Sequence, residues 1–164
     1  ICPSRGLGDV YKRQLLIRWP NKIKAGITND EMVQNLDFAQ TFLEAAGIDA
    51  PNDMQGESLI PLLTENGEDW TRDAVYYHYY EYPSVHMVKR HYGIVNKDYK
   101  LVRFYYDVDE WELYDRKNDP NEMNNVYNDP EYSDIVSDLK IQLAEMRKKY
   151  KDSEELDQKF IYKK

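Results

Sequence analysis

The stretch from Ala74 to Asp115 reads AVYYHYYEYPSVHMVKRHYGIVNKDYKLVRFYYDVDEWELYD, and it contains most of the chain's 15 tyrosines and all 3 of its histidines. Aromatic and β-branched side chains favour a pleated, half-buried surface. Turn-forming residues divide the stretch into short runs about ten residues apart, which is typical of an antiparallel meander. We therefore predict four strands, at residues 74–80, 88–95, 99–106 and 110–114.

Both faces of this predicted sheet carry apolar side chains. In the third run, Leu101 and Tyr105 fall on one face while Val102 and Phe104 fall on the other, because successive side chains of a strand alternate. A sheet that is apolar on both faces needs cover on both. We expect the segments before and after the sheet to supply it.

A helix is predicted directly after the sheet. Asp129 can act as its N-cap and Pro130 as its first helical residue. One apolar stripe then follows at helical spacing, formed by Ile135, Leu139, Leu143, Met146 and Tyr150. This stripe can lie across one face of the sheet. From residue 151 onward the charges alternate without a stripe, so we expect residues 151–164 to fray.

Two further elements are predicted before the sheet. The short apolar run LLIRWP, residues 15–20, suits a strand buried on both faces, and its neighbours would lie outside this chain. Thr28 and Glu31 form a capping-box pattern that opens an amphipathic helix of about seventeen residues, ended by Gly47. Asp37, within that helix, is expected to be a solvated charge.

These elements predict an α+β chain. A small antiparallel four-stranded sheet with a packed C-terminal helix is preceded by one buried strand, which needs neighbours from outside this chain, and by one helix. Residues 1–14, ICPSRGLGDVYKRQ, lack periodicity and a secretory core. They are similar to translated adapter sequence, so we interpret them as an unrelated, artefactual head.

Composition narrows the possible partners. The net charge of −8 argues against nucleic acid, which needs a basic face. No apolar run approaches the eighteen residues of a transmembrane helix, so no membrane partner is predicted. The single cysteine, Cys2, cannot form an internal disulfide and gives no information about the redox compartment.

Charge is nevertheless concentrated locally. Against the single anion Asp98, the segment 86–103 carries five cations, which are Lys89, Arg90, Lys97, Lys100 and Arg103. Two interpretations stay open: long cationic side chains that cover apolar surface with their heads in water, or a local anion site. By contrast, the Asp- and Asn-rich segment 115–125 lacks the glycine and glutamate of a calcium loop and is predicted to be a structural turn.

Four segments resemble one family in the expected order. They are LLIRWPNKIKAG, NLDFAQTFLEAAGIDA, GESLIPLL and WELYDRKNDPNEMNNV, and together they are similar to the C-terminal part of the arylsulfatase-like sulfatases. The segment EYPSVHMVKRHYG is most similar to the bacterial branch that acts on sulfated amino sugars and glycosaminoglycan fragments. The resemblance implies an alkaline-phosphatase-like fold. In it, the strand and helix of residues 15–72 are the remnant of a missing α/β/α parallel-sheet catalytic domain, and residues 73–150 form the C-terminal subdomain.

The resemblance also implies the chemistry of an intact parent enzyme. In this family a formylglycine attacks the sulfate and a calcium ion polarises the ester. Those residues correspond to sequence upstream of Leu15, so no catalytic residue and no metal ligand is assigned to this chain. Cys2-Pro3-Ser4-Arg5 is one residue too short for the nucleophile motif and is interpreted as coincidence.

Substrate recognition is the role left for this chain. We expect His86, Lys89, Arg90 and His91 to contact a sulfated sugar through hydrogen bonds and an ion pair. The alternative is that the histidines only satisfy local hydrogen bonds in the sheet.

The function predicted is therefore that of a C-terminal fragment of a sulfuric ester hydrolase acting on sulfated saccharides, inactive alone. The alternatives are a phosphodiesterase or phosphonate hydrolase of the same superfamily, or a free-standing carbohydrate-binding or interaction module.

Overall fold

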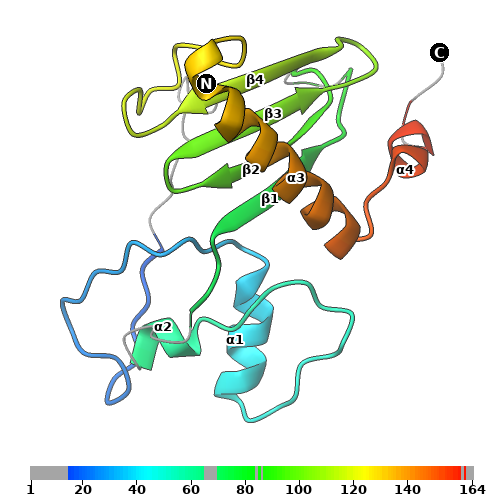
Figure 1. Cartoon of the computed structure of the whole chain (residues 1–164). Coiled ribbons are helices and arrows are strands. Elements are labelled where there is room, and N and C mark those ends of the chain that lie inside the picture. Colours follow the sequence, from blue (N-terminus) through cyan, green and yellow to red (C-terminus); the bar gives the residue numbers. More distant parts are fainter. Residues whose placement is uncertain (1–14, 65–69, 84, 86, 160, 162–164) are drawn as a thin grey trace.

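The computed structural model describes residues 15–64, 70–83, 85, 87–159 and 161. Its centre is one antiparallel sheet of four strands in sequential order, β1 (Ala74–Tyr79), β2 (His91–Asn96), β3 (Tyr99–Phe104) and β4 (Glu110–Asp115) (Figure 1). The predicted meander is confirmed. Strand β2 begins three residues later than predicted, because residues 88–90 belong to the loop that precedes it.

The register aligns one apolar row across the sheet. Tyr76 pairs with Ile94, Ile94 with Leu101, and Leu101 with Leu113. The last three side chains are completely buried. Helix α3 (Ser133–Lys149) crosses this face (Figure 1). The row and the helix together form the core of the protein.

The helix is positioned as its sequence predicts. The Asp129 side chain accepts a hydrogen bond from the Glu131 backbone N–H, and Pro130 opens the 3-10 turn η1 (Pro130–Tyr132) that leads into α3. Leu139 and Leu143 of the predicted stripe are buried against the sheet, together with Val136, which the stripe had not included. Each such leucine contributes about 1.5–3 kcal/mol through the area it removes from water.

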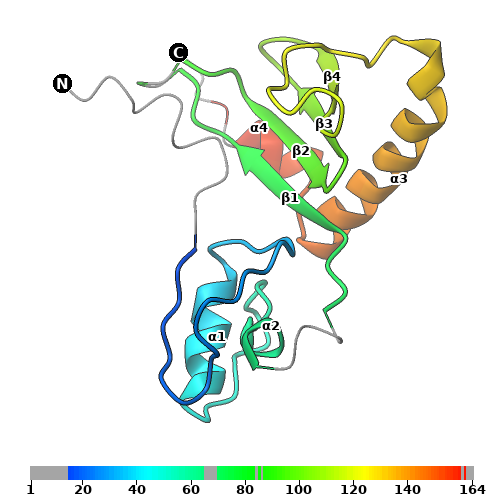
Figure 2. The same ribbon diagram turned by 90° about the vertical axis from the view of Figure 1, so that its left-hand side faces the viewer.

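The N-terminal segment lies beyond the Ala74 end of β1 (Figure 2). It contains α1 (Asp37–Ala45) and the short helix α2 (Ile60–Thr64). The predicted helix of about seventeen residues is wrong at its N-terminal half, since the capping box does not form and the Asn29 side chain instead accepts the Glu31 N–H in a local turn. Residues 15–18 are exposed and form no strand, as no described segment pairs with them.

Asp37 is the second correction in this segment, because it is completely buried rather than solvated. Its carboxylate accepts two hydrogen bonds from Arg72, at 2.5 and 2.8 Å, and one each from the backbone N–H groups of Gln34 and Glu57. Burial alone would raise the pKa of Asp37, but these hydrogen bonds outweigh it and lower that pKa. The carboxylate thereby joins α1 to the segment that leads into β1.

The C-terminal segment also differs from the frayed tail expected over residues 151–164. Within its described part, residues 154–159 form helix α4 (Glu154–Lys159), and Asp152 and Asp157 are tied to the sheet and to α3. Among the described residues, no helix combines the length and apolar character needed to cross a membrane.

Candidate functional site

The loop that connects β1 to β2 contains all but one of the predicted site residues, and its base is held by Arg90. The Arg90 side chain is 2% exposed. Its Nη1 donates to Asp107 Oδ2 at 2.7 Å and its Nη2 donates to the Tyr82 carbonyl. The guanidinium also lies near the Tyr82 and Tyr106 rings, 5.7 and 5.6 Å from their centroids. The charge of Arg90 is therefore paired inside the protein, although its buried Nε has no acceptor among the described residues.

Lys89 differs from Arg90 in that its ammonium contacts a tyrosine instead of a carboxylate. Its ammonium lies 3.9 Å from the centroid of the Tyr82 ring and donates a hydrogen bond to the Tyr82 hydroxyl. Within the described ranges, no carboxylate forms an ion pair with Lys89. Its half-buried positive charge is therefore available to an anion.

His91 begins strand β2 and is enclosed by aromatic rings. Its Nδ1 lies 2.8 Å from the Lys89 carbonyl oxygen, and because a carbonyl only accepts, Nδ1 carries the hydrogen. Burial lowers the pKa of His91 despite this hydrogen bond. The imidazole is then neutral at pH 7, and its Nε2 can accept a hydrogen bond from a hydroxyl.

His86 lies outside the described residues. Its neighbours in the sequence, Val85 and Met87, are 92% and 63% exposed. The described part of the loop thus combines an ordered base at Tyr82, Lys89 and Arg90 with apolar side chains that project into solvent at its tip.

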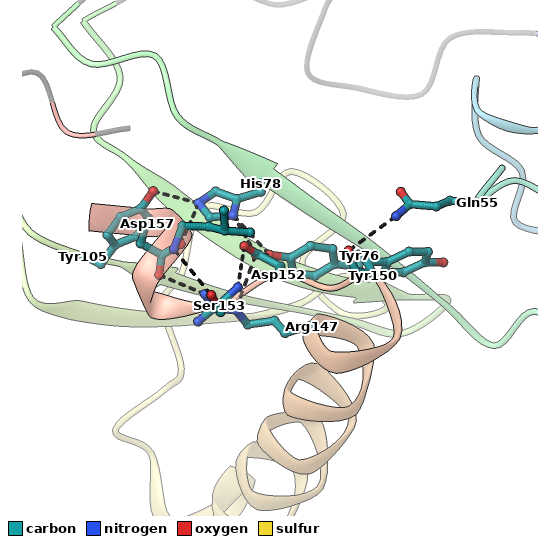
Figure 3. A network of polar contacts seen from close by, with 10 residues as sticks. Gln55, Tyr76, His78, Tyr105, Arg147, Tyr150, Asp152, Ser153 and Asp157 are labelled. Atoms are coloured by element: carbon teal, nitrogen blue, oxygen red, sulfur yellow. Dashed lines mark hydrogen bonds and ion pairs between the residues drawn. The ribbon is translucent and has the colours of Figure 1, made fainter. Parts of the chain in front are cut away.

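A second polar cluster, missed from the sequence, lies where the C-terminal segment meets the sheet (Figure 3). His78 Nδ1 donates to Asp152 Oδ2 at 2.8 Å, and the Tyr105 hydroxyl lies 2.7 Å from His78 Nε2. Arg147 Nη2 donates to Asp157 Oδ2 at 2.8 Å. These partners are up to 79 residues apart in the chain, so no local pattern indicated them.

The cluster fits a neutral imidazole. Burial lowers the pKa of His78 although Asp152 opposes it, and burial raises the pKa of Asp157 although Arg147 opposes that shift. For Asp152, burial is outweighed by hydrogen bonds from Tyr76 and His78, which lower its pKa. The pKa values of the two carboxyl groups are thus shifted in opposite directions, and the positive charge of Arg147 compensates their negative charge.

The same cluster has the residue types of a metal site. One ligand atom from each of His78, Asp152 and Asp157 lies within 4.8 Å of the others. Calcium, however, takes six to eight oxygen ligands, whereas this group offers two carboxylates and an imidazole beside the Arg147 guanidinium. The cluster does not fit calcium.

The Asp- and Asn-rich segment that follows β4 is a structural turn, as predicted. Asp115 Oδ1 accepts the backbone N–H groups of Lys117 and Asn118. Asp119 Oδ2 accepts those of Met123 and Asn124. Both carboxylates are thus used for backbone hydrogen bonds.

Comparison with known proteins finds relatives that are named sulfatases. The chain is 50% identical over 149 residues to the N-acetylglucosamine-6-O-sulfatase of Bacteroides thetaiotaomicron, covering 89% of this chain and 26% of that protein. It is 29% identical over 157 residues to an ulvan-active sulfatase of Formosa agariphila, covering 78% of this chain and 31% of that protein. The chain thus spans less than a third of either relative.

A solved structure gives the same result. It is described as a complex with its substrate D-glucosamine-2-N,6-O-disulfate, and it is 52% identical with a TM-score of 0.80. The match covers 84% of this chain and 28% of that one. The predicted sulfatase resemblance and its fold are therefore confirmed.

The family match extends over most of the chain. Residues 8–149 match the family described as N-sulphoglucosamine sulphohydrolase, C-terminal, so the match begins inside the segment 1–14 that the sequence alone set apart. The sheet, α3 and the N-terminal segment all fall within it. By this match the chain belongs to the family of C-terminal N-sulphoglucosamine sulphohydrolase domains.

Proposed function

We propose that this chain is the C-terminal part of a sulfatase that hydrolyses sulfate esters of amino sugars. The observation that carries the proposal is the 52% identity, at a TM-score of 0.80, to a structure whose substrate is D-glucosamine-2-N,6-O-disulfate. The relative named N-acetylglucosamine-6-O-sulfatase supports the same substrate class. Within the parent enzyme, the β1–β2 loop, residues 80–90, lines the sugar-binding cleft.

Lys89, His91 and His86 supply the recognition chemistry in this proposal. The ammonium of Lys89 has no carboxylate partner in the described part of the chain, so it can pair with a sulfate group. The Nε2 atom of His91 accepts a hydrogen bond from a sugar hydroxyl, and its Nδ1 is already held by the Lys89 carbonyl. His86, which lies outside the described residues, is included in the proposal on the sequence alone, as a third hydrogen-bond partner for the sugar.

The hydrolytic step belongs to the catalytic part of the parent. A formylglycine nucleophile and a calcium ion supply that chemistry in the family. The cluster of His78, Asp152 and Asp157 does not fit calcium. In this proposal the present chain contributes to binding and orienting the sugar, through Lys89, His91 and His86.

The test uses a full-length sulfatase in which residues 15–161 of this chain replace the corresponding C-terminal part. We expect Lys89→Ala to lower kcat/KM on glucosamine 6-sulfate about tenfold, the usual cost of losing one charged hydrogen bond. The matched control is Lys97→Ala. Lys97 lies on the β2–β3 turn, where it is exposed and forms an ion pair with Glu31 of the N-terminal segment. Unchanged kcat/KM for both Lys89→Ala and His86→Ala would exclude the proposed role of the loop.

Two further assays separate the alternatives. A phosphonate monoester hydrolysed faster than the sulfated sugar would favour the related phosphonate hydrolases. Tight binding of a sulfated glycan by the isolated 164-residue chain would instead favour a free-standing binding module. We expect neither, and no sulfate release by the isolated chain.

A further inference from the structure

We propose that Arg90 and Asp107 form a positioning pair that fixes the β1–β2 loop, residues 80–90, against the β3–β4 turn, residues 105–109. The pair thereby sets where Tyr82 and Lys89 stand relative to the sugar. This inference rests on the proposed function, in which the loop lines the sugar-binding cleft. It gives Arg90 a different role from the direct substrate contact expected from the sequence.

The contacts of Arg90 connect three separate points of the chain. Nη2 binds the Tyr82 carbonyl at the start of the loop, and Nη1 binds Asp107 in the neighbouring turn. The Arg90 carbonyl accepts the Tyr105 N–H at 3.3 Å, which continues the β2–β3 pairing beyond Phe104. One residue therefore joins both ends of the loop to the adjacent turn.

The turn side of this contact is equally well defined. Asp107 N–H donates to the Tyr105 carbonyl at 2.8 Å, and Tyr106 between them has a φ of 64°. That left-handed conformation is uncommon for a residue with a side chain, and here it directs the Tyr106 ring toward the Arg90 guanidinium. The turn thus presents a carboxylate and a ring to the same cation.

Burial decides between positioning and direct contact. A guanidinium that is 2% exposed, with Nη1 on Asp107 and Nη2 on the Tyr82 carbonyl, presents almost no surface to a sulfate. Lys89, the next residue back, has the same charge without a carboxylate partner in the described ranges, and it contacts Tyr82 from the ring side. The two cations therefore have different roles: Arg90 holds Tyr82 in place, and Lys89 pairs with the anionic group of the ligand.

The experiment uses the same full-length enzyme and a double-mutant cycle on the pair. We expect Arg90→Met and Asp107→Asn each to raise KM for glucosamine 6-sulfate about tenfold with kcat changed less than about twofold, since a displaced loop weakens binding of the sugar. The double variant should be no worse than Arg90→Met alone, because both changes break one interaction.

Direct contact predicts a different pattern. Asp107→Asn would then free the guanidinium and leave KM unchanged or lower. The effects of the Arg90 and Asp107 substitutions on KM would then be independent of each other. That result would overturn the proposal. Arg103→Met is the matched control, because Arg103 pairs with the more exposed Asp109 of the same turn, and we expect it to leave KM unchanged.

A second substrate separates local from general damage. 4-Nitrophenyl sulfate carries the ester without a sugar, so we expect Arg90→Met to leave its kcat/KM within about twofold of the parent. An equal loss on both substrates would mean that the pair only stabilises the fold, and the proposal would fall. If Lys89→Ala and His86→Ala alter KM while the Arg90 and Asp107 variants do not, the positioning role alone is excluded and the proposed function stands.

Discussion

The sheet unit, residues 74–150, and the N-terminal segment, residues 15–64, are held together by different forces. In the sheet unit, Ile94, Leu101 and Leu113 are completely buried beneath α3. In the N-terminal segment, large apolar side chains stay in water, with Leu16 87% exposed and Phe42 72% exposed. The sheet unit therefore has its own apolar core, whereas the segment leaves apolar surface uncovered.

The N-terminal segment is held in its conformation by polar interactions. The Asp37 carboxylate binds Arg72 and two backbone N–H groups, and the Thr41 hydroxyl accepts the Leu59 N–H at 2.9 Å. Leu59 and Leu62 are buried beside these groups. The difference shows that one part of this chain is specified by apolar periodicity and the other by a buried polar cluster centred on Asp37.

The largest effect expected from this comparison is in the sheet core. Leu101→Ala should lower the free energy of unfolding by about 4 kcal/mol, since it removes a fully buried side chain between Ile94 and Leu113. Phe42→Ala should change it by less than about 0.5 kcal/mol, because that ring is mostly in water. Urea denaturation followed by circular dichroism measures both. Equal losses would show that Phe42 belongs to a core and would remove the contrast.

The next effect concerns the ion pair of the N-terminal segment. Asp37→Ala leaves Arg72 buried without its carboxylate, so we expect the segment to lose about 3 kcal/mol of local stability. Hydrogen exchange at the Gln34, Glu57 and Leu59 amides reports this loss, because each donates to Asp37 or Thr41. Exchange in β3 should stay slow.

The control for that experiment is Glu57→Gln. Glu57 also lies near Arg72, at 3.5 Å, but its side chain is far more exposed than that of Asp37, so a small change is expected. If Asp37→Ala accelerated exchange equally in β3, the two regions would unfold as one unit.

The same contrast explains what the sequence could predict. Leu139 and Leu143 recur at helical spacing, and the strand residues between turns are aromatic or β-branched, so the sheet and α3 follow from local pattern. The resemblance to sulfatases likewise depends on local phrases. Apolar periodicity is visible within a few residues, which is why these predictions are confirmed.

The polar anchors could not be predicted in this way. Asp37 meets Arg72 across 35 residues, and His78 meets Asp152 across 74. A lone carboxylate in a polar stretch gives no sign of a partner so distant, so the sequence alone predicts Asp37 in solvent and a frayed tail. For the same reason, the burial of Arg90 against Asp107 does not follow from the local excess of cations.

The smallest effect distinguishes the two regions by pH. All histidines of the chain lie in the sheet unit, and burial lowers the folded-state pKa values of His78 and His91 below the usual 6.5. The unfolded chain therefore binds more protons as the pH falls through 6.5, and the sheet unit loses stability there. Asp37, with its lowered pKa, contributes stability that is lost only as the pH falls below about 3.8. Between pH 7 and 5 the N-terminal segment should thus keep its stability while the sheet unit becomes weaker.

His78→Gln isolates one part of that dependence. His78 faces Asp152, Asp157 and Arg147. Asp157 changes the stability in the opposite direction to His78, because its pKa is raised and its contribution to stability is lost as the pH rises from 3.8. The difference in unfolding free energy between the parent chain and His78→Gln should therefore shrink from pH 7 to pH 5, by at most about 1.4 kcal/mol per pH unit, the limit for one proton. A difference that stayed constant would mean that His78 titrates alike in the folded and unfolded chain. The contrast between the two regions would then rest on packing and the ion pair alone.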